Sequence, residues 1–193
     1  STALVLGRRT AVTGTRAADI AALRYAVELA RDQAGPYEAA WRDRRFTGQK
    51  AYAAWAALLR DPTEPVEDRH HANMAGRLLD ARRVAVRYLG DLAAREPGAA
   101  APRLLDAAAA YEQALGVLSR IDPDGLAASM ERRRAVAEQI DSVATLERTA
   151  AACLEAAVPL MTVHHGRDRT WIDLPGFDTG QYASSVHGAQ ARI

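Results

Sequence analysis

The sequence contains very few lysine, cysteine and aromatic residues. Lys50 is the only lysine among 25 basic residues, Cys153 is the only cysteine, and aromatic residues make up 6% of the 193 positions. A single cysteine excludes a disulfide within the chain and is typical of a reducing compartment. Together with the arginine-rich and alanine-rich composition, it leads us to expect a bacterial protein of the cytoplasm.

Long apolar runs and an excess of charge of one sign are also missing. No run of about 18 apolar residues occurs, so we expect no membrane-spanning helix and no membrane partner. The formal net charge is +1, which gives no electrostatic reason to expect nucleic acid as a partner. The chain also lacks a P-loop, a GxGxxG motif, a CxxC motif and a nucleophile elbow. No familiar catalytic motif is therefore present.

Alanine is abundant, and apolar residues make up 49% of the chain. Alanine is the best helix former and allows helices to approach closely. Apolar residues recur every three or four positions in five segments, which predicts five helices. The predicted helices span 17–33, 47–61, 66–95, 101–120 and 122–158. We therefore expect an all-α fold, an antiparallel bundle of about five helices with an irregular C-terminal tail.

The predicted helix ends coincide with capping residues and prolines. Thr47 is expected to cap the second helix, and Asp122 is expected to cap the fifth, with Pro123 in its first turn. The apolar faces of five helices exceed what one small bundle needs. We therefore predict a dimer that pairs through the third and fourth helices.

Three regions follow from these patterns. Residues 1–16 are predicted as a leader or a short strand pair, residues 17–158 as the bundle, and residues 159–193 as the irregular tail. The tail holds four glycines and three of the five histidines, and its segment TWIDL is a candidate for a short strand pair. A tail of this length is typical of a functional or a disordered segment.

The richest polar cluster of the sequence lies in this tail. Its members are candidates for catalytic residues: His164, His165, Asp168 and Asp173. Imidazoles and carboxylates are suited to acid–base catalysis or to zinc binding. Because their spacing matches no zinc signature, we expect no metal and no cofactor. A solvated turn is the simpler interpretation, and a catalytic site is the alternative.

Three segments occur in a familiar order: FTGQKAYAAWAALL, HHANMAGRLLDARRVAVRYLGDLA and LLDAAAAYEQALGVLSRIDP. This order resembles the helical C-terminal region of the butirosin biosynthesis protein H-like family, which is also described as peptidase C39-like. The similarity covers about two thirds of the chain. The matching residues are Gly48, Tyr52, Trp55, Asn73, Arg82 or Arg83, and Tyr111.

In that family a papain-like domain precedes the helices and carries a cysteine nucleophile, which Cys153 does not match. The best-known member moves an acyl group from a carrier protein to an aminoglycoside amine. The resemblance implies a helical binding or interaction domain in natural-product biosynthesis. Such a domain would complete the substrate pocket of a catalytic partner domain, or an oligomer. The alternative is a small stand-alone enzyme that uses the tail residues, with or without a metal, so enzymatic activity stays open.

Six residues are candidates for contacts with a small-molecule ligand: Trp41, Tyr52, Trp55, His71, Asn73 and Arg83. Aromatic residues at helical spacing are more often part of a core, so we expect the aromatic candidates to be core first and pocket wall second. His70 and His71 are adjacent on a predicted helix and are poor joint metal ligands. The arginine-rich stretches 82–87 and 132–134 are interpreted as solvated helix faces, with an anion site as the alternative.

Overall fold

The computed structural model describes residues 16–31, 47–96 and 98–161. Within these residues the chain forms helices and no strand, which confirms the all-α prediction. The elements are α1 (Arg16–Ala30), α3 (Gly48–Arg60), α4 (Asp68–Arg95), α5 (Ala100–Leu118) and α6 (Met130–Ala157), followed by the short 3-10 helix η1 (Val158–Leu160). Both predicted strand pairs lie outside the described residues. None of the described helices is long and apolar enough to cross a membrane.

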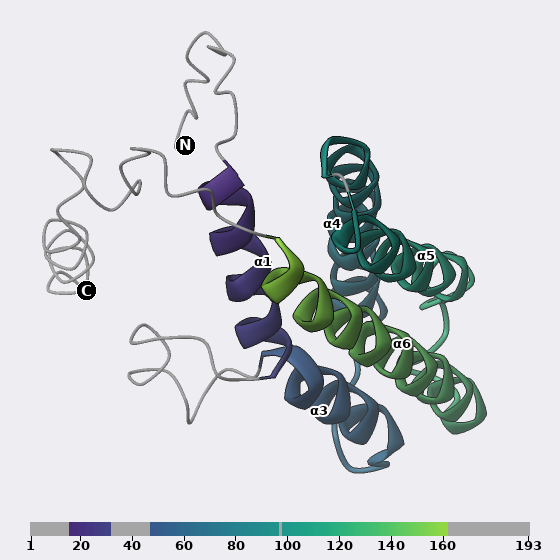
Figure 1. The fold of residues 1–193 in the computed structure, drawn as a ribbon. Coiled ribbons are helices and arrows are strands. Elements are labelled where there is room, and N and C mark those ends of the chain that lie inside the picture. Colours follow the sequence, from purple (N-terminus) through teal and green to yellow (C-terminus); the bar gives the residue numbers. More distant parts are fainter. Residues whose placement is uncertain (1–15, 32–46, 97, 162–193) are drawn as a thin grey trace, which may run out of the picture. The chain divides into compact units, whose positions relative to one another are not determined.

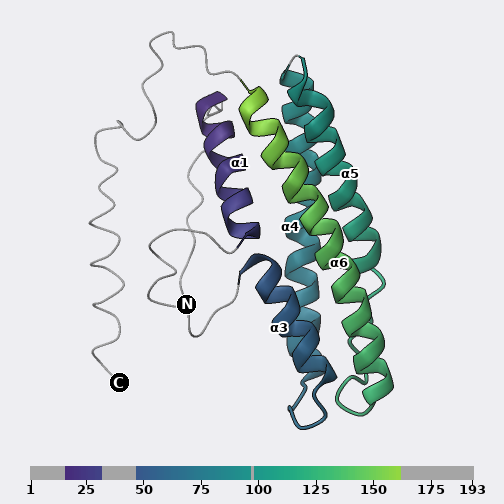
Figure 2. The same cartoon turned by 60° about the horizontal axis from the view of Figure 1, so that its bottom comes forward.

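The chain divides into two compact units, and the unit Ile20–Thr162 contains the described helices apart from the first residues of α1. In this unit α5 packs against both α4 and α6, and α3 packs against α6 (Figure 1). Helices α1 and α3 follow one another end to end (Figure 2). Their 15 and 13 residues add to 28, which is the length of α4 and of α6. The unit is therefore a four-helix bundle in which one helix is broken.

Gly48 allows the two halves of the broken helix to meet. Its φ angle is +50°, in the left-handed region that glycine adopts most easily. A side chain at this position would also collide with the carbonyl oxygens of Leu29 and Ala30. The end of α1 therefore touches the start of α3 directly because residue 48 has no side chain.

Each half of the broken helix packs against a different part of the core. Residues Ile20 and Leu23 of α1 belong to an apolar cluster with the last turns of α4, the first turns of α5 and the end of α6. Trp55 and Leu59 of α3 belong to a second cluster, with the other end of α5 and the first half of α6. Burial of each large apolar side chain contributes roughly 1.5–3 kcal/mol. Packing thus holds α1 and α3 in line.

Helix α6 begins later than the sequence predicts, at Met130 rather than directly after Pro123. The carboxylate of Asp122 accepts a hydrogen bond from the amide of Asp124 at 3.1 Å, which forms a turn instead of a helix cap. The side chain of Ser129 caps α6 in its place. The prediction that Asp122 caps this helix was therefore wrong.

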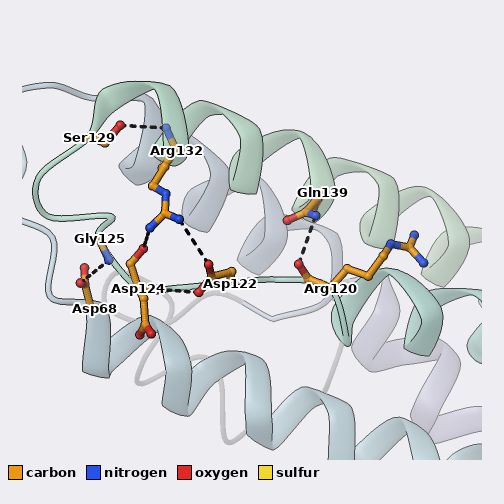
Figure 3. A network of polar contacts seen from close by, with 8 residues as sticks. All are labelled: Asp68, Arg120, Asp122, Asp124, Gly125, Ser129, Arg132 and Gln139. Atoms are coloured by element: carbon orange, nitrogen blue, oxygen red, sulfur yellow. Dashed lines mark hydrogen bonds and ion pairs between the residues drawn. The ribbon is translucent and has the colours of Figure 1, made fainter.

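The loop before α6 is hydrogen-bonded to the start of α4 (Figure 3). The carboxylate of Asp68 accepts hydrogen bonds from the amides of Gly125 at 2.7 Å and Ala127 at 2.9 Å. Gly125 has a φ angle of +78°, which an L side chain rarely adopts. Because Asp68 lies 57 residues before Gly125, this long-range contact could not be read from the local sequence.

Candidate functional site

A polar layer crosses the bundle at the level of the helix break. Its four side chains come from α3, α4, α5 and α6, and they are Tyr52, Arg82, Tyr111 and Glu147. On α6 the layer lies between Ala144, which belongs to the apolar cluster of α3, and Ala150, which belongs to the cluster of α1. The polar layer therefore separates the two halves of the core.

Arg82 and Glu147 form a bidentate ion pair within this layer. The Arg82 Nε and Nη2 atoms donate to the two carboxylate oxygens of Glu147, and the Nη2–Oε2 distance is 2.7 Å. Burial lowers the pKa of Arg82, but the hydrogen bonds and charge of Glu147 outweigh burial and raise the pKa above its ordinary value. The guanidinium also lies 5.0 Å from the centroid of the Tyr111 ring. Arg82 is thus held in its charged form, and the two opposite charges of the pair offset one another.

The two tyrosines of the polar layer keep their protons. Burial first, and then the charge of Glu147, raises the pKa of Tyr52 above its ordinary value, while Arg82 opposes the shift. The same two causes raise the pKa of Tyr111 to about 12. The buried Tyr52 hydroxyl lies beside the ion pair, yet it has no hydrogen-bond partner of acceptable geometry in the described part of the chain. The hydroxyl still interacts with Arg82 and Glu147, which both act on its pKa.

A cavity of about 480 Å³ lies beside the polar layer, between α1, α3 and α4. This volume is within the range of small-molecule pockets. All four members of the polar layer line it, and most of the remaining wall is apolar. The apolar residues of the wall are Ala26, Leu29, Ala30, Ala51, Trp55, Met74 and Leu78. The site therefore combines an apolar wall with a few convergent polar groups.

His71 positions the Trp55 indole that forms part of this wall. Trp55 Nε1 donates to His71 Nδ1 at 2.8 Å, and the two rings are stacked with an angle of 17° between their planes. His71 is 3% exposed. Burial first, and then the charges of His70 and Arg133, lowers the pKa of His71, while Asp68 opposes the shift. A neutral imidazole with its proton on Nε2 fits this geometry.

The structure brings some of the sequence-predicted ligand residues together. Tyr52 and Trp55 are buried in the core and also line the cavity. His71 does not line the cavity but accepts a hydrogen bond from Trp55. Asn73 and Arg83 are exposed, and neither lines the cavity. Arg83 instead pairs with Asp80, one turn away on α4, at 3.1 Å. Trp41 and the tail candidates lie outside the described residues.

Sequence reasoning interpreted Arg82 as part of a solvated helix face and did not single out Glu147. A signal was present, because both residues occupy the apolar heptad position of their helix. Arg82 lies seven residues after the buried Ala75 and seven before the buried Leu89, and Glu147 lies at the same spacing between Ile140 and Leu154. A charged residue at a core position of two helices indicates an interhelical pair.

Sequence reasoning also missed the role of Arg133. This buried side chain places Nη2 at 3.0, 2.7 and 3.1 Å from the carbonyl oxygens of Leu58, Asp61 and Glu64, respectively. It thereby satisfies carbonyl groups at the end of α3, which a helix end leaves without partners. Arg133 is therefore a structural residue of the loop after α3.

Other reactive groups of the described helices do not converge. No group of three or more His, Cys, Asp or Glu side chains in residues 16–31, 47–96 and 98–161 could hold a metal ion. The pKa of Cys153 is raised first by burial and then by the charge of Asp106, with Arg103 opposing, so its sulfur is held as the less reactive thiol. The described part of the chain offers a binding geometry and no activated nucleophile.

Comparison of the chain with protein-family models, with curated proteins and with solved structures returned no match.

Proposed function

We propose that this chain is a helical binding module that holds a small, largely apolar molecule in the cavity beside the polar layer. The observation that carries the proposal is the occurrence of the helix break, the cavity and the buried ion pair at one level of the bundle. A continuous helix in place of α1 and α3 would leave the bundle without this opening.

The energetics of the polar layer support a role beyond stability. A buried ion pair is often no more stabilising than apolar side chains of similar volume, because removing the charges from water is costly. The buried hydroxyl of Tyr52 makes no hydrogen bond of ordinary geometry within the described residues and so contributes little to stability. Polar groups of this kind at the wall of an apolar pocket are typical of sites that orient a ligand.

In this proposal the chain supplies a pocket, and a catalytic partner domain or a second copy completes the assembly. This agrees with the resemblance to helical domains of natural-product acyltransferases and peptidase-like proteins. The alternative enzyme would use His164, His165, Asp168 or Asp173. It rests on residues outside the described part of the chain and stays a prediction.

The proposal is tested with N-phenyl-1-naphthylamine, a neutral dye whose fluorescence rises in apolar sites. We expect saturable binding to the wild type and none to Ala51→Trp, because the larger side chain fills the cavity from its wall. Ala53→Trp is the matched control, since Ala53 is exposed on the same helix and does not line the cavity. Thermal melts establish that both variants fold. Absence of dye binding to the wild type, or equal binding to Ala51→Trp, would contradict the proposal.

A further inference from the structure

We infer that the molecule bound in this cavity carries one negative charge, of the carboxylate kind, on an otherwise apolar body, and that Arg77 receives this charge. The inference rests on the proposed function and adds the chemical class of the ligand to it.

The positive and negative charges of the cavity wall do not balance. Glu147 is the only acidic residue among the described residues of the wall, and Arg82 binds both of its oxygens. Arg77 lies in the same wall, is exposed, and forms no hydrogen bond or ion pair within the described part of the chain. The wall therefore has one unneutralised positive charge and no carboxylate that is free to bind a cation.

Two helix ends also line the cavity and add little net charge to it. The start of a helix carries a partial positive charge and its end carries a partial negative charge. Here the last carbonyl groups of α1, at Leu29 and Ala30, meet the first turn of α3 at Gly48. The two partial charges lie side by side and offset one another. Arg77 therefore decides the sign of charge that the cavity prefers.

Charged residues also lie next to the cavity. A neighbouring hollow at the same junction shares Ala30 and Gln49 with it. The charged residues of this hollow are Arg31, Lys50, Arg148 and Glu155, which are three bases and one acid. Arg31 pairs with Glu155, and the Arg148 guanidinium donates to Gln49 of the cavity wall at 3.1 Å. A positive charge beside the cavity raises the local concentration of anions.

The number of charges follows from the same wall. Arg77 presents one guanidinium, and a guanidinium matches a carboxylate with two parallel hydrogen bonds. The other cation of the wall, Arg82, is already bound by Glu147. A doubly charged group would leave one of its charges without a partner in the wall, so a monoanion fits best.

Two compounds of one shape separate the effect of charge from that of apolar contact. We would titrate the full chain with 2-naphthoate and with the neutral 2-naphthamide, using calorimetry. We expect 2-naphthoate to bind about fivefold more tightly, the factor expected for an ion pair near the surface. Arg77→Gln should remove this difference by weakening 2-naphthoate. Arg69→Gln is the matched control, because Arg69 is exposed on the same helix and does not line the cavity.

The outcomes distinguish this inference from the proposed function. Equal affinity of the wild type for both compounds, or a preference for 2-naphthoate that survives Arg77→Gln, would overturn the inference and leave an apolar binding site in place. Failure of both compounds to bind the wild type would contradict the proposed function itself, and the inference with it. A preference for 2-naphthoate that disappears only in Arg77→Gln supports both.

Discussion

Glu147 is a carboxylate that is only 5% exposed, and its two oxygens are bound by one arginine. Such a residue is costly to bury and is tolerated because Arg82 compensates its charge. The pair joins α6 to α4 and lines the same cavity as Ala30 at the end of α1 and Gly48 at the start of α3. At the scale of single residues, the wall of the cavity thus contains a charge pair that adds little stability, which is the basis for proposing that it orients a ligand.

The ion pair yields a prediction about stability. Glu147→Leu leaves the charge of Arg82 buried without a partner and should lower the free energy of unfolding by about 3 kcal/mol. The double variant Arg82→Met/Glu147→Leu removes both charges and should return to within about 1 kcal/mol of the wild type or exceed it. Urea unfolding measures all three proteins. A double variant as unstable as the single one would show that the pair serves mainly to hold the bundle together.

His71 yields a prediction about pH. The folded protein keeps His71 neutral at pH values where the unfolded chain is already protonated, because burial lowers its pKa. Its contribution to stability is therefore complete above the ordinary histidine pKa of about 6.5 and is lost as the pH falls below that value. We expect the melting temperature to fall from pH 7 to pH 5, and the emission of the buried indole of Trp55 to change with it.

Two variants separate His71 from its neighbour in this experiment. His71→Leu should lose about 1–3 kcal/mol at pH 8, because the Trp55 donor is left without an acceptor, and should lose most of the acid sensitivity. His70→Gln should keep the stability at pH 8 and most of the acid sensitivity, since His70 is exposed and burial is the larger cause of the lowered pKa of His71. An unchanged pH dependence in His71→Leu would assign the acid sensitivity to another group.

At the scale of helices, the break between α1 and α3 depends on Gly48. Gly48→Ala places a side chain against the carbonyl oxygens of Leu29 and Ala30 and requires a positive φ angle. We expect a loss of at least about 2 kcal/mol in unfolding free energy, since the left-handed conformation alone costs about 1–2 kcal/mol. Dye binding should weaken as well, because α1 is displaced from the cavity.

A second helical glycine supplies the control for this variant. Gly76 lies within α4, and a side chain there would meet no atom within 4 Å. Gly76→Ala should therefore stabilise the protein by about 0.5–1 kcal/mol. Equal effects of the two substitutions would contradict the close contact between α1 and α3.

The sequence predicts the helices well because their apolar period is regular and prolines or glycines interrupt it. It fails at residues 122–129, where Asp122 and Pro123 carry the local signature of a helix start. Contacts that are distant in sequence decide this segment, since Asp68 binds the amides of Gly125 and Ala127. The helix propensity of residues 122–129 alone cannot predict these hydrogen bonds to Asp68.

The candidate site could be predicted in part. Tyr52 and Trp55 were expected to serve as core and pocket wall, and the structure places both in these positions. Arg82 was interpreted as part of a solvated face because Arg83 and Arg87 lie close to it in the sequence, and Glu147 was not singled out. Only their heptad spacing indicates a buried pair. The cavity itself lies where two helix ends meet, and the apolar period within a single helix cannot predict such a junction.

At the scale of the whole molecule, a dimer through α4 and α5 stays a prediction. Val84 on α4 is 69% exposed and Leu105 on α5 is 53% exposed. If these side chains lie in the predicted interface, light scattering should report a dimer for the wild type. Val84→Glu/Leu105→Glu should then be a monomer, since each substitution places a charge in an apolar contact. A monomeric wild type would contradict the prediction.

The central claim is that the cavity at the helix break binds a small molecule, and the methionines test it most directly. The chain has three, Met74, Met130 and Met161, and only Met74 lines the cavity. We would label their methyl groups with carbon-13 and titrate the protein with 2-naphthoate in an NMR experiment. The account predicts a saturable shift of the Met74 signal, with Met130 and Met161 unchanged. A Met74 signal that stays in place, or three signals that shift alike, would contradict it.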